Sequence, residues 1–272
     1  MNDTSGNALT STNGSRYNLK GPAGAPVLAL IHGLGLNRQI WDRFVAGLVP
    51  RYRVLTYDLY GHGETAAAPV KPSVRLYSQQ LIELMDELGI ERCSLVGFSL
   101  GGMINRRVAI DHPERVSALI ILNSPHERGA EAQALVEQRA LDSAAGGPGA
   151  TLDATIERWF TPQFRAAHDD YIQQVRNWVL ANDAHNYALA REVLAFGVIE
   201  LIRPQPPIVK PALVMTCEND SGSTPAMSQA IASEIAGAEV IIVPALKHMG
   251  LAENPGFFVT ALGEFLESVE GL

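Results

Sequence analysis

The stretch CSLVGFSLGG, residues 93–102, decides the fold of this chain. Its first six residues form an apolar run that predicts a buried strand, and residues 99–111 have the composition of a helix that follows it. At the junction, Ser99 lies in the pattern G-x-S-x-G. On a tight strand-to-helix turn such a serine is held above the sheet, and the flanking glycines let backbone segments pass closely. The pattern also suits a serine that only caps a helix, so the rest of the chain has to decide between a nucleophile and a cap.

On both sides of this stretch, short apolar runs alternate with helix-like segments, which predicts parallel strands joined by helical crossovers. The expected strands are Val27–Ile31, Val54–Tyr57, Cys93–Phe98, Val116–Leu122, Ala212–Cys217 and Val240–Val243. The expected helices are Arg38–Leu48, Val74–Leu88, Ser99–Asp111, Pro225–Ile235 and Gly256–Val269. The sequence therefore predicts an α/β fold with a mostly parallel central sheet flanked by helices.

The alternation stops between residues 124 and 204, where no strand-like run occurs. The segments with helical spacing in this region are Ala130–Ala145, Thr151–Phe160, Asp169–Ala181 and Tyr187–Phe196. We expect residues 124–204 to form an inserted helical cap on a core of residues 16–123 and 205–272. Residues 1–15, which are rich in Asn, Ser, Thr and Gly, are expected to be a flexible N-terminus.

The composition is that of a globular enzyme, because 47% of the 272 residues are hydrophobic and 18% are charged. The net charge is −8 and no Lys/Arg cluster occurs, so we expect a small-molecule substrate and no binding to nucleic acid or membrane. No apolar stretch approaches the roughly 20 residues that span a bilayer, and no export signal is evident. Cys93 and Cys217 fall inside apolar runs, which favours reduced, buried thiols and a cytoplasmic protein. A monomer and a homo-oligomer both fit the sequence.

A serine nucleophile needs a base, and the base needs a carboxylate that orients it. Of the seven histidines, only His248 follows a late strand through a short loop, so it is the candidate base. Asp220 is the candidate acid, because it follows a strand of its own and stands between the serine and the histidine in the chain. Glu218 is the alternative acid and lies nearer to the strand end. Asn123, after the preceding strand, cannot carry the negative charge.

An oxyanion formed at this serine would need two backbone N–H groups. We assign them to Leu100, the residue after the serine, and to Leu34, in the loop His32-Gly33-Leu34-Gly35 that follows an early strand. The histidines are scattered and no cysteine pair has ligand spacing, so we expect no metal site. No glycine loop of the phosphate-binding kind is present, and no cofactor is expected.

The cap is expected to cover the site, so its aromatic residues and the neighbours of the catalytic candidates are the predicted substrate contacts. These predicted contacts are Asn37, Arg38, Phe98, Trp159, Trp178 and Met249, with Phe160 and Tyr187 as further cap aromatics. Plain core packing is the alternative for the aromatic residues, and a helix cap is the alternative for Asn37.

With these residues in place, the chain resembles the α/β-hydrolase superfamily from about Arg16 to Val269. The resemblance rests on the serine turn, His32-Gly33, Asp58-Leu59-Tyr60-Gly61-His62-Gly63, Asp220 and His248, which occur in the order of that family. Within the superfamily the chain is most similar to small bacterial esterases and 3-oxoadipate enol-lactonases. The resemblance implies an α/β-hydrolase fold and the cleavage of a small carboxylic ester or enol-lactone through an acyl-enzyme. It also implies that Asp58 braces its loop and has no catalytic role.

The resemblance leaves two other functions open. Carbon–carbon bond hydrolases, which cleave vinylogous diketones from aromatic ring cleavage, share the Ser, Asp and His residues. Some proteins of this fold are small-molecule receptors that do not turn over their ligand. Haloalkane dehalogenases and epoxide hydrolases are excluded, because they carry an aspartate where this chain has Ser99. Two departures, Leu59-Tyr60 in place of a common arginine and Cys217 in place of a common glycine, leave the exact substrate undecided.

Overall fold

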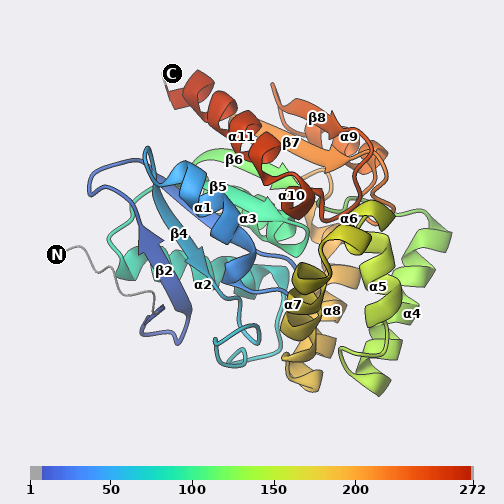
Figure 1. Ribbon diagram of the computed structural model, residues 1–272. Helices are drawn as coiled ribbons and strands as arrows, with labels where there is room; N and C mark the ends of the chain where they lie inside the picture. The colour runs from blue at the N-terminus through green and yellow to red at the C-terminus, as the bar shows by residue number, and fades with distance from the viewer. Residues whose placement is uncertain (1–7, 271–272) are drawn as a thin grey trace.

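The apolar runs of the chain form the centre of an eight-stranded sheet in the computed structural model, which describes residues 8–270 (Figure 1). The strands lie in the order β1-β2-β4-β3-β5-β6-β7-β8. Their bounds are β1 (Leu9–Thr10), β2 (Arg16–Lys20), β3 (Val27–Ile31), β4 (Arg53–Tyr57), β5 (Cys93–Phe98), β6 (Val116–Leu122), β7 (Ala212–Cys217) and β8 (Glu239–Val243). The pairs β1/β2 and β2/β4 are antiparallel and the other pairs are parallel, which confirms the predicted mostly parallel sheet.

The middle of the sheet is buried on both faces. Every residue of β5 and β7 is buried, as expected for parallel strands with helices on both sides. Gly97, at the end of β5, is aligned with Ile31 of β3 and Ile121 of β6. The carboxyl ends of these strands therefore meet at one edge of the sheet, where ligands bind in open α/β sheets.

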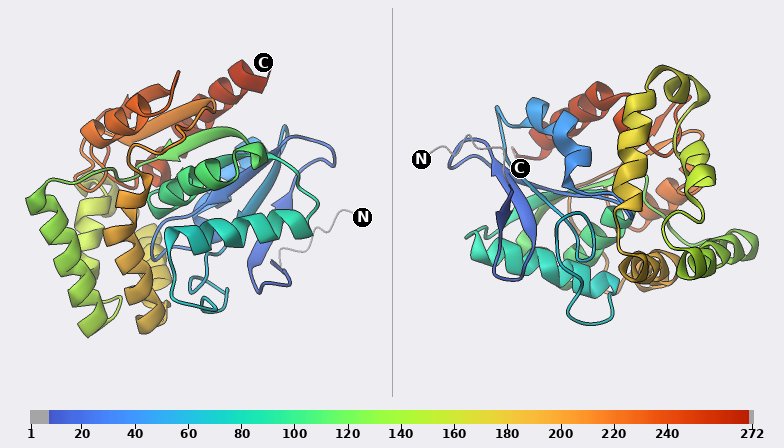
Figure 2. Two further views of the ribbon diagram at one scale, coloured as in Figure 1. Left: turned by 180° about the vertical axis from the view of Figure 1, so that it is seen from behind. Right: turned by 60° about the horizontal axis from the view of Figure 1, so that its bottom comes forward.

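Helices cover both faces of the sheet. The helices outside the insertion are α1 (Asp42–Leu48), α2 (Val74–Glu87), α3 (Leu100–Asp111), α9 (Pro225–Ser233), α10 (Gly250–Glu253) and α11 (Pro255–Glu270), with short 3₁₀ turns η1 (Arg38–Trp41) and η2 (Pro113–Arg115). Helices α1 and α11 pack together on one face, and α2 and α3 pack together on the other (Figures 1 and 2). Side-chain caps explain two of the helix starts, because Ser73 accepts from the N–H of Leu76 at α2 and Thr224 accepts from the N–H of Met227 at α9.

The insertion between β6 and β7 is helical. It contains α4 (Ala130–Gly146), α5 (Leu152–Trp159), α6 (Pro162–Ala167), α7 (Asp169–Leu180), α8 (Ala184–Phe196) and η3 (Gly197–Leu201). Helix α4 packs against α8, and α5 and α6 pack against α7. In Figures 1 and 2 these helices form one layer beside the carboxyl edge of the sheet.

The N-terminal part of the sheet was not predicted from the sequence. Strand β2 has one buried residue, Tyr17, and lies between β4 and the two-residue strand β1, so it forms no continuous apolar run. The sheet therefore starts at Leu9, ahead of residue 16, where the core was expected to begin. Of the expected flexible N-terminus, residues 8–15 include strand β1, while residues 1–7 lie outside the described residues. Helix α6 was also not predicted.

Within the described range, no helix has both the length and the apolar character needed to cross a membrane. The two cysteines, Cys93 and Cys217, are buried and not joined in a disulfide.

Candidate active site

Ser99 lies between β5 and α3 in a backbone conformation that side-chain-bearing residues rarely adopt, with φ of 56° and ψ of −112°. Its N–H donates to the carbonyl of Leu122 at 2.8 Å, which ties the turn to the end of β6. A Cβ added to Gly101 would overlap the carbonyl oxygen of Ile31, and one added to Gly97 would overlap the Gly101 carbonyl. The two glycines are therefore required because three backbone segments cross here.

The predicted acid and base are joined. His248 Nδ1 lies 2.6 Å from Asp220 Oδ2, and both side chains are buried. The same carboxylate oxygen accepts from the Asn123 amide at 2.9 Å, and the other oxygen accepts from the N–H groups of Gly222 and Ser223. Because an ionised Asp220 can only accept, Nδ1 carries the proton and Nε2 of the same ring is the basic nitrogen.

Asp220 remains ionised because of these contacts. Burial by itself raises the pKa of a carboxyl group, but the charge and hydrogen bond of His248 and the hydrogen bonds from Asn123 and Ser223 outweigh it. The pKa of Asp220 is therefore below its ordinary value of 3.8.

This lowered pKa predicts how the stability depends on pH. A carboxyl group whose pKa is lower in the folded state stabilises the protein above its unfolded-state pKa, and the contribution is lost as the pH falls through the folded-state pKa. We expect the difference in Tm between the wild type and Asp220→Asn to shrink as the pH is lowered from about 6 to about 3. Thermal melts of the two proteins across this range test the prediction, and a constant difference in Tm would contradict it.

The alternative acid, Glu218, points elsewhere. Its carboxylate accepts from the N–H of Ala245 at 2.9 Å, and the residue is exposed. Asn123, which sequence analysis excluded as the acid, instead holds the acid in place through its amide. Its backbone φ of 45° lies in the left-handed region, which asparagine tolerates better than most residues.

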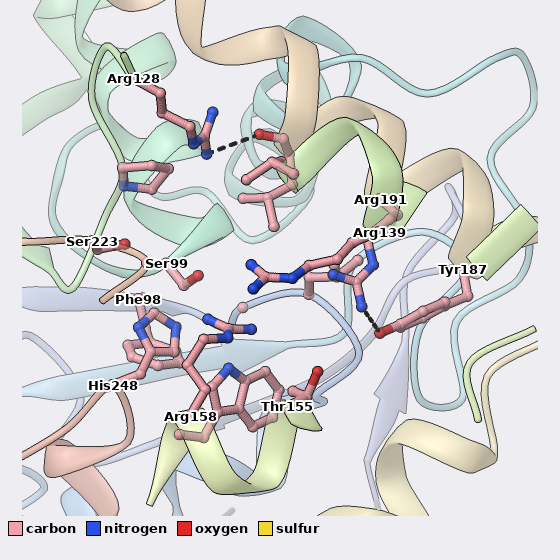
Figure 3. A pocket seen from close by; sticks show the side chains of 17 residues that line it. Phe98, Ser99, Arg128, Arg139, Thr155, Arg158, Tyr187, Arg191, Ser223 and His248 are labelled. Carbon is pink, nitrogen blue, oxygen red and sulfur yellow. Dashed lines mark hydrogen bonds between the residues drawn. The ribbon is translucent and has the colours of Figure 1, made fainter. Parts of the chain in front are cut away.

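Ser99 and His248 line the same cavity, which has a volume of about 60 Å³ and lies between the sheet edge and the cap (Figure 3). The Phe98 ring lies 5.0 Å from the His248 ring, and the Trp159 ring lies 5.9 Å from it on the cap side, measured between centroids. No hydrogen bond joins Ser99 Oγ to His248 among the described residues, a looser arrangement that is common when no substrate is bound.

The two predicted oxyanion donors lie at this site. Leu34 lines the cavity, and Leu100 is the first residue of α3, where backbone N–H groups have no intrahelical acceptor. Within residues 8–270, the N–H groups of Leu34 and Leu100 have no protein acceptor. The nearby His32 has a structural role, because its Nε2 accepts from the N–H of Leu59 at 3.0 Å and burial lowers its pKa to about 4.

Four of the predicted substrate contacts do not line the cavity, namely Asn37, Arg38, Trp178 and Met249. Asn37 caps η1 by accepting from the N–H of Gln39, and Arg38 pairs with Asp58 and Glu64. Trp178 donates to the Gln39 side chain. Met249 is fully buried, and its N–H donates to the Trp159 carbonyl. They remain predictions, since closeness to the oxyanion loop or to His248 along the chain does not fix the direction of a side chain.

Asp58 braces its loop, as the resemblance implies. Its carboxylate accepts from the N–H groups of Arg38 and Glu64 and pairs with the Arg38 guanidinium. A Cβ added to Gly63 would overlap this carboxylate, so the loop requires glycine at that position.

The charge of the cavity does not follow from the sequence. Four arginines line it, Arg128, Arg139, Arg158 and Arg191, together with the predicted contacts Phe98 and Trp159 and the cap aromatic Tyr187. They come from the segment before α4 and from α4, α5 and α8, so no spacing in the sequence connects them.

Among the described residues, no group of three or more His, Cys, Asp or Glu side chains is arranged to hold a metal ion.

Comparisons with known proteins cover nearly the whole chain. The family model described as the alpha/beta hydrolase family matches residues 28–261. The chain is 31% identical over 245 residues to 3-oxoadipate enol-lactonase 2 of Acinetobacter baylyi, with 89% of each protein covered. It is 25% identical over 241 residues to (E)-2-((N-methylformamido)methylene)succinate hydrolase of the same organism, with 89% of this chain and 90% of that protein covered. The crystal structure of the enol-lactonase from Burkholderia xenovorans LB400 matches with a TM-score of 0.86 and 28% identity, over 94% of this chain and 98% of that one.

Proposed function

Since the chain belongs to the alpha/beta hydrolase family, we propose that it hydrolyses a small carboxylic ester or enol-lactone with Ser99, His248 and Asp220 as a catalytic triad. The observation that carries the proposal is the buried Asp220–His248 pair at the cavity that Ser99 also lines. The relative named 3-oxoadipate enol-lactonase 2 supports a lactone or ester substrate, because its name assigns a lactone to a protein 31% identical to this chain.

In the proposed reaction, His248 Nε2 removes the proton of the Ser99 hydroxyl as the serine oxygen attacks the carbonyl carbon. The negative charge that develops on the carbonyl oxygen is stabilised by the N–H groups of Leu34 and Leu100 and by the N-terminal end of α3. When the intermediate collapses, the bond to the leaving oxygen breaks and His248 returns the proton to that oxygen. Water, deprotonated by the same histidine, then releases the acid from Ser99.

Asp220 acts on this reaction through His248. Its carboxylate fixes the proton on Nδ1 and stabilises the positive imidazolium that forms when Nε2 takes the serine proton. Asn123, Gly222 and Ser223 hold the carboxylate by donating to its oxygens, so the acid cannot rotate away from the histidine.

A substrate screen tests the proposal. We expect multiple turnovers of p-nitrophenyl acetate or butyrate or of a small lactone, and little loss of colour from a vinylogous diketone made by aromatic ring cleavage. Loss of the diketone colour with the esters untouched would show carbon–carbon bond hydrolysis instead. Ligand-dependent thermal stabilisation with no more than one turnover would show a receptor.

A further inference from the structure

The cavity beside Ser99 carries positive charge that the protein does not neutralise. None of Arg128, Arg139, Arg158 and Arg191 forms an ion pair with a residue in the described part of the chain. Arg191 is 5% exposed, and its Nε is buried without a hydrogen-bond partner. Because buried charges are normally paired, four guanidinium groups in one cavity indicate that the missing partners come with a ligand.

Three of the arginines form a cluster next to the proposed triad. Burial, together with the charges of Arg139 and Arg191, lowers the pKa of Arg158 to about 10, although Asp220 acts in the opposite direction. The Asp220 carboxylate is already bound to His248. Figure 3 shows the guanidinium groups of Arg139 and Arg158 pointing toward Ser99.

The hydrogen bonds of this cluster leave most of its donors free. Arg191 donates to the hydroxyl groups of Thr151 and Tyr187 at 3.0 Å, and both acceptors are neutral. Arg139 and Arg158 make no hydrogen bond with the described residues. The cluster can therefore offer its guanidinium forks to a carboxylate, which matches their geometry.

Arg128 lies apart from this cluster, on another wall of the same cavity (Figure 3). It donates to the carbonyl oxygens of Leu194 and Ala195 at the end of α8, and burial is the cause that lowers its pKa to about 10. Its Nε is buried without a partner. The cavity thus has two cationic walls with Ser99 between them.

We propose, on the basis of the function proposed above, that the substrate carries two carboxylates, one bound by Arg139, Arg158 and Arg191 and the other by Arg128. The scissile ester or lactone carbonyl then lies between the two carboxylates at Ser99. The cavity volume of about 60 Å³ suits only a compact molecule. Hydrolysis of such a lactone opens the ring and gives a compact tricarboxylate, whereas hydrolysis of such an ester releases an alcohol and an acid.

Binding to Ser99→Ala tests this substrate class without turnover. The probes are acetate, succinate and tricarballylate, with one, two and three carboxylates, and inorganic phosphate as a single-site anion. We expect the affinity to rise by about 10-fold or more with each added carboxylate, in calorimetric titrations at fixed ionic strength. Equal affinities for acetate and tricarballylate, or phosphate binding as tightly as tricarballylate, would overturn the two-carboxylate proposal.

Variants of the two walls sharpen the test. We expect Arg128→Met and Arg139→Met each to weaken tricarballylate binding by about 10- to 100-fold. The matched control is Arg176→Gln, a cap arginine on α7 that pairs with Asp153 at 2.6 Å outside the cavity, and it should leave the affinity unchanged. Where a methionine variant does not fold, the lysine variant of the same residue keeps the charge and should bind more weakly than the wild type.

The two proposals can fail separately. Serine-dependent hydrolysis of p-nitrophenyl acetate without tight tricarballylate binding would leave the proposed function intact and overturn the carboxylate sites. Tight binding of tricarballylate by a protein that hydrolyses no ester or lactone would support the carboxylate sites and overturn the proposed function.

Discussion

Ser99→Ala is expected to lower kcat for p-nitrophenyl acetate by about 10⁴-fold or more. The alanine keeps the turn between β5 and α3 but removes the oxygen that attacks the carbonyl, so no acyl-enzyme can form. Steady-state rates at equal protein concentration, with Tm values to show that the variant folds, measure the effect. The hydroxyl of Ser99 donates no hydrogen bond within the described structure, so little change in Tm is expected.

The matched control is Ser233→Ala, which removes an exposed serine hydroxyl at the end of α9. It should keep the wild-type rate, because this serine lies outside the cavity. If Ser99→Ala retained more than about a tenth of the wild-type rate, the nucleophile would have to be another residue.

Asp220→Asn is expected to lower kcat by about 10³- to 10⁴-fold. An asparagine amide has the shape of the carboxylate but carries no charge, so it neither stabilises the imidazolium nor forces the proton of His248 onto Nδ1. The histidine can then present a protonated Nε2 to Ser99, where a base is needed. Rates with p-nitrophenyl acetate between about pH 6 and pH 9 test this, because the loss should persist across the range.

Glu218→Gln provides the comparison for this prediction. Glu218 is the other acidic residue after β7, and it faces the N–H of Ala245, away from His248. The rate of Glu218→Gln should stay within about threefold of the wild type. A larger loss for Glu218→Gln than for Asp220→Asn would reverse the two assignments.

The strands and the family were within reach of the sequence. Strands β6 and β7 have the predicted bounds, because strands buried on both faces form nearly continuous apolar runs, interrupted here only by Ser117 and Thr216. The α/β-hydrolase fold and the resemblance to enol-lactonases are confirmed by the family match and the solved relative. Strand β2 was missed because only one of its five residues is buried, so it forms no apolar run.

The candidate triad could also be found in the sequence, for a topological reason. Ser99, Asp220 and His248 each follow a parallel strand, and the carboxyl ends of parallel strands lie at one edge of the sheet. The order of the residues along the chain therefore places them near one another before any side chain is positioned.

The substrate contacts depend on the tertiary structure. Arg38 is three residues from the end of the oxyanion loop and yet pairs with Asp58, because the direction of its side chain follows from its surroundings and not from its place in the chain. Arg128, Arg139, Arg158 and Arg191 lie far apart in sequence and meet only because α4, α5 and α8 pack over the sheet edge. The sequence by itself determined the sheet and the candidate triad, since strand burial and strand order fix them. The packing of the cap decided the charge of the cavity, because that charge depends on which faces of separate helices turn inward.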